Sequence, residues 1–326
     1  MEKVVVRRGG LADVSQIAAI HCSDLEDNLW YRFPEGKRVA AKRVSELTLY
    51  ERWLNGGSWM SEELCAIYLN NLLLNGHMPL VAELDGKLVG ELELFYGKEN
   101  DGHLYAHIGV LQVHKEYQRR GIGTLLVQKA IITAKKRGAS YLTVRPRDVV
   151  RDFYKKLGFA EWLKTVVFFA EAAPFVSGLT WKEDTTIFNK QKFWPFIMGY
   201  EQSSAQIWQI FHVNQFALPE FTREPIHTGL VSGRGKEVVA IFYPHVYFGD
   251  MANVYAWSNK GPNKEDLWTM LTLAYQFGYD KVRSLLTEDK YEGLKDSCSL
   301  AEIERQEIFR LNLKEREIYE MAGFVC

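Results

Sequence analysis

The fold of this 326-residue sequence is decided by the stretch Gln118-Arg119-Arg120-Gly121-Ile122-Gly123. It follows a strand-like run, Leu104–Val113, and opens a segment whose apolar residues recur every three or four positions, as on one face of a helix. Two glycines let the backbone approach a ligand, and the free N–H groups of a first helical turn favour an anion. The stretch therefore predicts a pyrophosphate site. A tight turn with two solvated arginines is the alternative.

The elements around this stretch are predicted to be strands and helices in mixed order. Asp85-Gly86 favours a hairpin between Leu80–Leu84 and Leu88–Leu94, because both turn residues tolerate positive φ. Further expected elements of this half are a helix after Asp13, helices within residues 25–78, a strand at Tyr141–Val144, a helix at Asp148–Leu157 and a strand at Glu161–Ala170. The pattern indicates an antiparallel front half followed by a β-α-β crossover.

A similar order of elements returns after Pro174–Asp184, which is expected to be a linker. The expected elements there are strands at His227–Ser232, Glu237–Phe242, Asn253–Trp257 and Val282–Leu286, and a helix at Lys264–Gln276. In addition, Tyr154–Phe159 and Tyr319–Phe324 share the pattern Tyr-x-x-x-Gly-Phe. The sequence therefore predicts two similar domains, residues 1–176 and 177–326.

Two motifs at a characteristic distance indicate a family. Val113 is followed by Gln118-x-x-Gly121-x-Gly123, and some 30 residues later by Phe153-Tyr154-x-x-x-Gly158-Phe159. Over residues 3–170 this arrangement resembles the GNAT acyltransferases. A Rossmann site fits less well, because Leu126 stands where a third glycine is needed. The resemblance implies an α/β (α+β) fold of two GNAT-like domains, each a twisted, mixed, mainly antiparallel sheet flanked by helices.

The resemblance also implies a cosubstrate, acetyl-CoA, and the residues that bind it. The backbone of Arg119–Thr124 would hold the pyrophosphate, and the preceding strand would pair with the pantetheine arm. The implied binding residues are Leu111, Gln112, Val113, Gln118, Arg119, Arg120, Gly121, Ile122, Gly123, Thr124 and Tyr154. The Val113 N–H is the expected donor to the thioester oxygen, where negative charge develops.

Proton transfer needs an acid and a base. By resemblance Tyr154 protonates the departing thiolate; a packing tyrosine is the alternative. His107 stands eleven residues before Gln118, where some relatives have a glutamate base, and an imidazole titrates near neutrality. A histidine satisfied within the sheet is equally compatible. Glu91 and Glu93, which share one strand face, are the other candidate bases, with a solvated edge as their alternative.

Composition and charge exclude several other kinds of partner and site. Forty basic and 41 acidic residues give a net charge of −1, so neither nucleic acid nor an anionic membrane is an expected partner. The start carries no signal-like segment, and no apolar run approaches the ~18 residues of a membrane span. Four widely spaced cysteines predict free thiols in the cytoplasm, and His21, His77, His103 and His114 lack metal-ligand spacing.

The expected reaction is direct transfer of an acetyl group to a primary amine, on a small molecule or on a peptide or protein. Use of another acyl-CoA, or a non-catalytic CoA-binding or partner-binding module, remains open. Asp24, Glu26 and Asp27 attract a cationic amine or form a solvated turn. The CoA site of the second half is expected to be degenerate, because its loop at 258–265 has one glycine and a proline, which has no N–H. One chain is therefore expected to bind one CoA.

Overall fold

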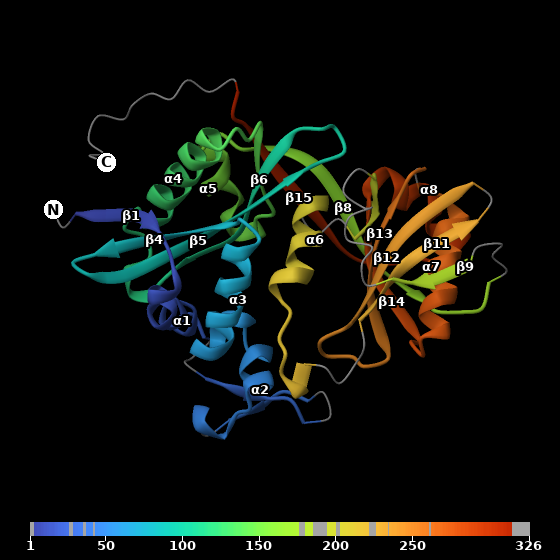
Figure 1. The fold of residues 1–326 in the computed structure, drawn as a ribbon, viewed down its shortest axis with the longest axis horizontal. Helices are drawn as coiled ribbons and strands as arrows, with labels where there is room; N and C mark the ends of the chain where they lie inside the picture. The colour runs from blue at the N-terminus through green and yellow to red at the C-terminus, as the bar shows by residue number, and fades with distance from the viewer. Residues whose placement is uncertain are drawn as a thin grey trace.

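The computed structural model describes residues 3–25, 29–34, 37–41, 43–175, 180–184, 194–199, 203–221, 226–233, 235–260 and 262–314. Within these residues, thirteen strands form one sheet, and two short strands form a separate pair. The sheet is mainly antiparallel and is flanked by helices (Figure 1). The predicted fold class is confirmed.

The elements of the first half are those predicted, except that two short strands, Tyr31–Arg32 and Val39–Ala40, lie where only helices were expected. They are β1 (Val4–Arg8), α1 (Val14–Cys22), β2 (Tyr31–Arg32), β3 (Val39–Ala40), α2 (Leu49–Leu54), α3 (Glu62–Leu74), β4 (Met78–Leu84), β5 (Lys87–Lys98), β6 (Leu104–Val113), α4 (Ile122–Lys136), β7 (Tyr141–Val144), α5 (Arg151–Lys156) and β8 (Ala160–Glu171). The β4–β5 hairpin turns at Asp85 and Gly86, whose φ angles are 49° and 80°. This left-handed turn is the one that the Asp-Gly pair predicts.

The second half contains more structure than the sequence pattern indicated. Its elements are β9 (Thr180–Glu183), β10 (Phe196–Met198), α6 (Ser204–Val213), β11 (His227–Gly233), β12 (Lys236–Pro244), β13 (Met251–Ser258), α7 (Lys264–Gln276), β14 (Lys281–Thr287), α8 (Glu288–Cys298) and β15 (Ala301–Asn312). The linker prediction was wrong in part, because β9 lies within it and pairs with β11. Neither α8 nor β15 was predicted.

The order β11-β12-β13-α7-β14-α8-β15 repeats the order β4-β5-β6-α4-β7-α5-β8. In this repeat α8 and β15 correspond to α5 and β8, which contain and follow the Tyr154 motif. The Tyr319–Phe324 echo lies outside the described residues. The repeat of whole elements therefore supports a duplication better than the short echo does.

The two halves exchange strands. The sheet order is β1-β4-β5-β6-β7-β15-β8-β14-β13-β12-β11-β9, and the thirteenth strand, β10, pairs with β13 outside this order. Thus β15, from the end of the described chain, lies between β7 and β8 and is antiparallel to both, while β8 pairs with β14 of the second half. Phe309, Leu311 and Leu313 join the core beneath α4. The sheet is continuous across the predicted boundary at 176/177, whose position stays a prediction.

The helices of the first half cover opposite faces of the sheet. Leu92 and Leu94 of β5 pack with α4 on one face, whereas Leu88 and Phe95 pack with α1 and α3 on the other. Helix α6 of the second half lies beside α3 on this second face, between α3 and the strands of the second half (Figure 1). It is anchored there by Glu99, whose Oε1 accepts a hydrogen bond from the Ala205 N–H at 3.0 Å.

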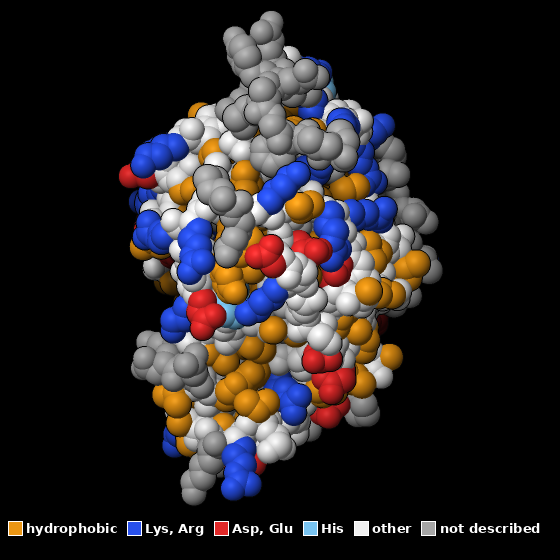
Figure 2. All heavy atoms as spheres, turned by 90° about the vertical axis from the view of Figure 1, so that its left-hand side faces the viewer, with side chains coloured by type: hydrophobic (Ala, Val, Ile, Leu, Met, Phe, Trp, Pro, Cys, Tyr) orange, Lys and Arg blue, Asp and Glu red, His pale blue; other side chains and the backbone are white. Residues whose placement is uncertain are grey.

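The surface carries both charges. On the face shown in Figure 2, basic and acidic side chains lie among apolar ones, and neither charge covers the face alone. This mixture agrees with the net charge of −1. In the described part of the chain, no helix is both long enough and apolar enough to cross a bilayer.

Candidate active site

The turn between β6 and α4 leaves the start of a helix open. Gln118 closes the turn by donating from Nε2 to the Val113 carbonyl at 3.1 Å. Arg119 and Gly121 have left-handed φ angles of 64° and 81°. Gly121 is the N-cap residue of α4, and no side chain within the described ranges caps this helix. The N–H groups of its first turn therefore remain available to an anion.

Gly123 is not required by packing. A Cβ there would lie 3.7 Å from Phe153 Cζ and 4.0 Å from Leu111 Cδ2, which are ordinary contacts. By contrast, a Cβ at Gly90 on β5 would lie only 3.1 Å from Leu126, where the helix packs on the sheet. The absence of a side chain at Gly123 keeps the first turn of α4 accessible, as the binding of a large anion requires.

The main chain before this turn has a free edge. Strand β6 pairs with β7 only over Tyr105–Ile108, whereas it pairs with β5 up to Val113. In the described part of the chain, residues 109–113 thus have no neighbouring strand on the β7 side. The His114 N–H donates to the Val89 carbonyl of β5 at 2.9 Å. N–H groups alternate in direction along a strand. Because the His114 N–H points toward β5, those of Leu111 and Val113 point the other way, into the gap on the β7 side of β6.

Tyr154 lies on α5, beside the start of α4. Its ring is 5% exposed and lies edge-on to Phe153 at 4.9 Å and to Phe159 at 5.5 Å. Phe153 is the residue that faces Gly123. Burial raises the pKa of the Tyr154 phenol above its usual value, so that it is protonated at neutral pH. Tyr154 is therefore in the protonated form that a general acid needs.

His107 is enclosed within the sheet. Its Nδ1 lies 2.8 Å from Thr143 Oγ1, and the Thr143 hydroxyl donates to the Ala106 carbonyl, so that Nδ1 is the donor to Thr143. Burial, and then the charge of Arg145, lower the pKa of His107 to about 3. Among the described residues, its Nε2 is buried without a hydrogen-bond partner. This burial fits a histidine enclosed within the sheet better than it fits a base that titrates near neutrality.

Glu91 and Glu93 face α1 and α3, and both are 0% exposed. They are therefore not on a solvated edge. Glu93 accepts hydrogen bonds from Trp59 Nε1 at 2.9 Å and from the Tyr68 hydroxyl at 2.6 Å. Burial and the neighbouring charge of Glu91 raise the pKa of Glu93 well above its usual value. Both oxygens of Glu93 are thus occupied by structural contacts.

Glu91 instead pairs with a histidine that the sequence did not assign to the site. Glu91 Oε1 contacts Nε2 of His21 on α1, and the His21 ring stacks on Trp59 at 4.9 Å. In the β5–β6 ladder, Glu91 lies directly opposite Gln112. Gln112 lies between Leu111 and Val113, whose N–H groups face the gap. The pair is therefore one strand away from the free edge of β6.

A signal for His21 is present in the sequence. Val14, Ile17 and Ala18 form the apolar face of α1, and His21 continues this face at the next turn. A polar residue on an inner helix face needs a partner. The partner is 70 residues away, however, and only the fold reveals it.

The corresponding helix of the second half is closed at its start. Asn263 caps α7 by accepting from the Asp266 N–H at 3.0 Å, and the Asn263 N–H donates to Asp266 at 2.8 Å. Asp266 is buried and pairs with Lys236. The acidic side chain of Asp266 thus lies at the helix start, where a bound anion would otherwise lie. Gly261 lies outside the described residues. Binding of one CoA per chain stays a prediction.

Residues 44–159 match the model of the acetyltransferase (GNAT) family. This segment forms a GNAT-family domain. The fold of the chain is similar to that of a GCN5-related N-acetyltransferase from Anabaena variabilis, with a TM-score of 0.63 and 14% identity over 95% of this chain and 73% of that one. It is also similar to a GCN5-related N-acetyltransferase from Kribbella flavida, with a TM-score of 0.57 and 12% identity over 95% of this chain and 72% of that one. A third similar structure is Eis1 from Mycobacterium abscessus, with a TM-score of 0.52 and 12% identity over 95% of this chain and 74% of that one. The likeness of fold thus extends through the second half. The GNAT prediction is confirmed.

Proposed function

We propose that this protein is an N-acyltransferase that transfers an acetyl group from acetyl-CoA to a primary amine. The observation that carries the proposal is the free edge of β6 at residues 109–113, which leads directly into the uncapped start of α4. Such an edge offers hydrogen bonds to an extended amide chain, and the helix start offers them to phosphates. Two of the similar structures are named as N-acetyltransferases, which supports acetyl as the transferred group.

Different residues bind the cosubstrate, stabilise the developing charge and donate the proton. The thioester supplies an activated acyl group. The backbone of Arg119–Thr124 holds the pyrophosphate, and the N–H groups of Leu111 and Val113 face the thioester oxygen, on which negative charge develops. Tyr154 donates a proton to the departing thiolate.

The pair of Glu91 and His21 accepts the proton of the amine. An alkylammonium ion has a pKa of about 10 and must lose a proton before it attacks. Among the described residues, no Lys or Arg forms an ion pair with Glu91 or Glu93. The buried Glu91 carboxylate beside His21 therefore favours a cationic acceptor. The acceptor amine then approaches beside Trp59.

The reaction is tested by measuring thiol release from acetyl-CoA with a panel of polyamines, aminoglycosides, amino acids and peptides. Turnover that depends on an amine supports the proposal, and the amine with the highest kcat/KM identifies the acceptor class. Binding of CoA without turnover on any amine would instead favour a CoA-binding module.

Gly123→Glu tests the phosphate site. The substitution places a carboxylate at the first turn of α4, where it repels the phosphates, so we expect CoA affinity to fall more than tenfold, above ~1.4 kcal/mol. Gly293→Glu is the matched control, because Gly293 is also helical and has nothing within 4 Å of an added Cβ. Calorimetry with CoA measures both. Equal affinities in the two variants would remove the site from this loop.

Tyr154→Phe tests the acid. Because the phenol acts only as the thiolate departs, we expect kcat to fall by about 100-fold while CoA affinity is unchanged. Tyr291→Phe is the control, since it removes a buried phenol from α8, the corresponding helix of the second half. If kcat is the same in Tyr154→Phe as in the unmodified protein, Tyr154 is only a packing residue.

A further inference from the structure

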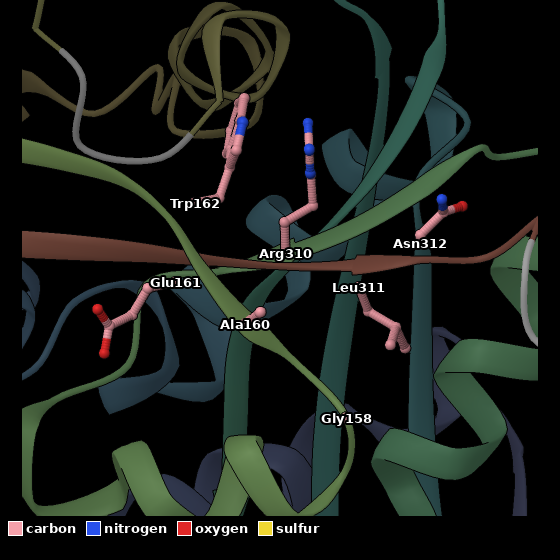
Figure 3. Close-up of a pocket in the computed structure, with 7 residues that line it drawn as sticks. All are labelled: Gly158, Ala160, Glu161, Trp162, Arg310, Leu311 and Asn312. Carbon is pink, nitrogen blue, oxygen red and sulfur yellow. The ribbon is translucent and has the colours of Figure 1, made fainter.

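A cavity of about 580 Å³ is lined by the start of β8 and the end of β15, where the two halves exchange strands. It is lined by Gly158, Ala160 and Glu161-Trp162 at the start of β8 and by Arg310–Asn312 on β15. Figure 3 shows Arg310 and Trp162 projecting to one side of the strands and Leu311 to the other. No role in acyl transfer has been assigned to these residues.

Arg310 is held in place by aromatic rings. Its guanidinium carbon lies 4.5 Å from the ring centre of Tyr141 and 4.8 Å from that of Trp162. The hydrogen bond found for the guanidinium within the described ranges is a long one, from Nη1 to the Tyr105 hydroxyl at 3.5 Å. Stacking of this kind fixes the plane of the guanidinium before a ligand arrives, which lowers the entropy cost of binding.

No carboxylate of the described residues compensates the positive charge of Arg310. Within the described residues, no carboxylate forms an ion pair with it. Arg305 on the same strand differs, because it contacts Glu288, Glu292 and Glu302. The nearby acids are already engaged: Glu161 pairs with Lys155 at 2.9 Å, and Asp101 accepts from the Tyr105 hydroxyl at 2.9 Å. With respect to the described part of the chain, most of the five N–H donors of Arg310 thus have no hydrogen-bond partner.

This cavity is separate from the glycine turn. Arg310 lies opposite Thr143 on β7, which in turn lies opposite His107 on β6. Two strand spacings therefore place the Arg310 Cα roughly 10 Å from the His107 Cα. His107 lies in the paired part of β6, before the free edge at residues 109–113. The pyrophosphate site begins at Arg119, beyond that free end. A ligand in the cavity would be a second one.

We propose that this cavity is a binding site for a small molecule that carries a carboxylate or a phosphate group, with Arg310 as its anchor. The planar guanidinium matches two oxygens of such a group at once. The Asn312 side chain adds an amide donor, because its oxygen already accepts from the Lys314 N–H at 3.0 Å. The cavity volume lies within the range of small-molecule sites. The site does not depend on the proposed acyl transfer.

The test is modification of arginines in the native full chain by phenylglyoxal, followed by mass spectrometry of the Arg310 and Arg305 peptides. Inorganic phosphate and acetate are the two probes, with sodium chloride at equal ionic strength as the control. We expect Arg310 to react in chloride and to be protected at least fivefold by one of the two anions, while Arg305 changes by less than twofold. CoA at a concentration that saturates the glycine turn should leave the Arg310 rate unchanged.

Three outcomes would overturn the proposal. They are equal protection of both arginines, no reaction of Arg310 in chloride because the chain itself covers it, and protection of Arg310 by CoA. Thermal unfolding gives an independent measurement. The protecting anion should raise Tm in the unmodified chain and in Arg305→Gln, which removes the same charge from the same strand, but not in Arg310→Gln. An equal rise in Arg310→Gln would also contradict the site.

Discussion

Removal of residues 177–326 is expected to abolish cooperative unfolding of the first half. The deletion takes away β15, the strand that lies between β7 and β8. Ile308, Phe309, Leu311 and Leu313 are all buried, with exposures between 0% and 6%. At ~1.5–3 kcal/mol per buried side chain, their loss costs roughly 6–12 kcal/mol, as much as the whole stability of a typical domain. Circular dichroism during heating measures the transition.

The control is a fusion that restores only β15. Phe169 of β8 pairs with Ala301 of β15 in an antiparallel ladder, so a short turn can join the two strands directly. A chain of residues 1–171, Asn-Gly and residues 301–314 should unfold cooperatively, whereas residues 1–176 alone should not. If the shorter fragment shows an equally sharp transition, β15 is not needed and the first half is an independent domain.

Local patterns predicted the elements that flank the glycine turn. The Asp85-Gly86 hairpin and the start of α4 depend on residues within a few positions of one another, and both occur where the sequence placed them. Turn chemistry and helical periodicity are properties of short windows. The sequence could therefore position the glycine turn without knowledge of the rest of the fold.

The strand exchange was not predictable in the same way. Strand β15 begins with Ala301–Arg305, all of which are exposed, so the alternation that marks a half-buried strand is absent there. Its partner β7 is more than 150 residues earlier in the chain. The burial of His107 was not predictable for the same reason. Its strand was predicted, but the pairing of that strand with β7, which buries the ring beside Thr143, is a non-local contact.

Glu91→Gln is expected to lower kcat/KM by about 100-fold or more, with CoA affinity unchanged. The amide keeps the size of the carboxylate but cannot support a positive charge on His21, so the pair no longer accepts the proton of the amine. Within the described ranges, Glu91 Oε2 is buried without a hydrogen-bond partner, which leaves its charge directed at His21. His21→Phe should have a similar effect, because it keeps the stacking on Trp59 and removes the basic nitrogen.

Glu93→Gln is the matched control for this pair. It makes the same replacement of a carboxyl by an amide two residues further along the same face of β5, but both Glu93 oxygens are held by Trp59 and Tyr68. Because burial raises the pKa of Glu93, its protonated form is already favoured, and the amide resembles that form. We expect a loss below tenfold. The two losses of kcat/KM, measured at one pH with the same amine, decide between the residues. A larger loss in Glu93→Gln would assign proton transfer to Glu93, and a loss below tenfold in both variants would assign it to a residue outside this pair.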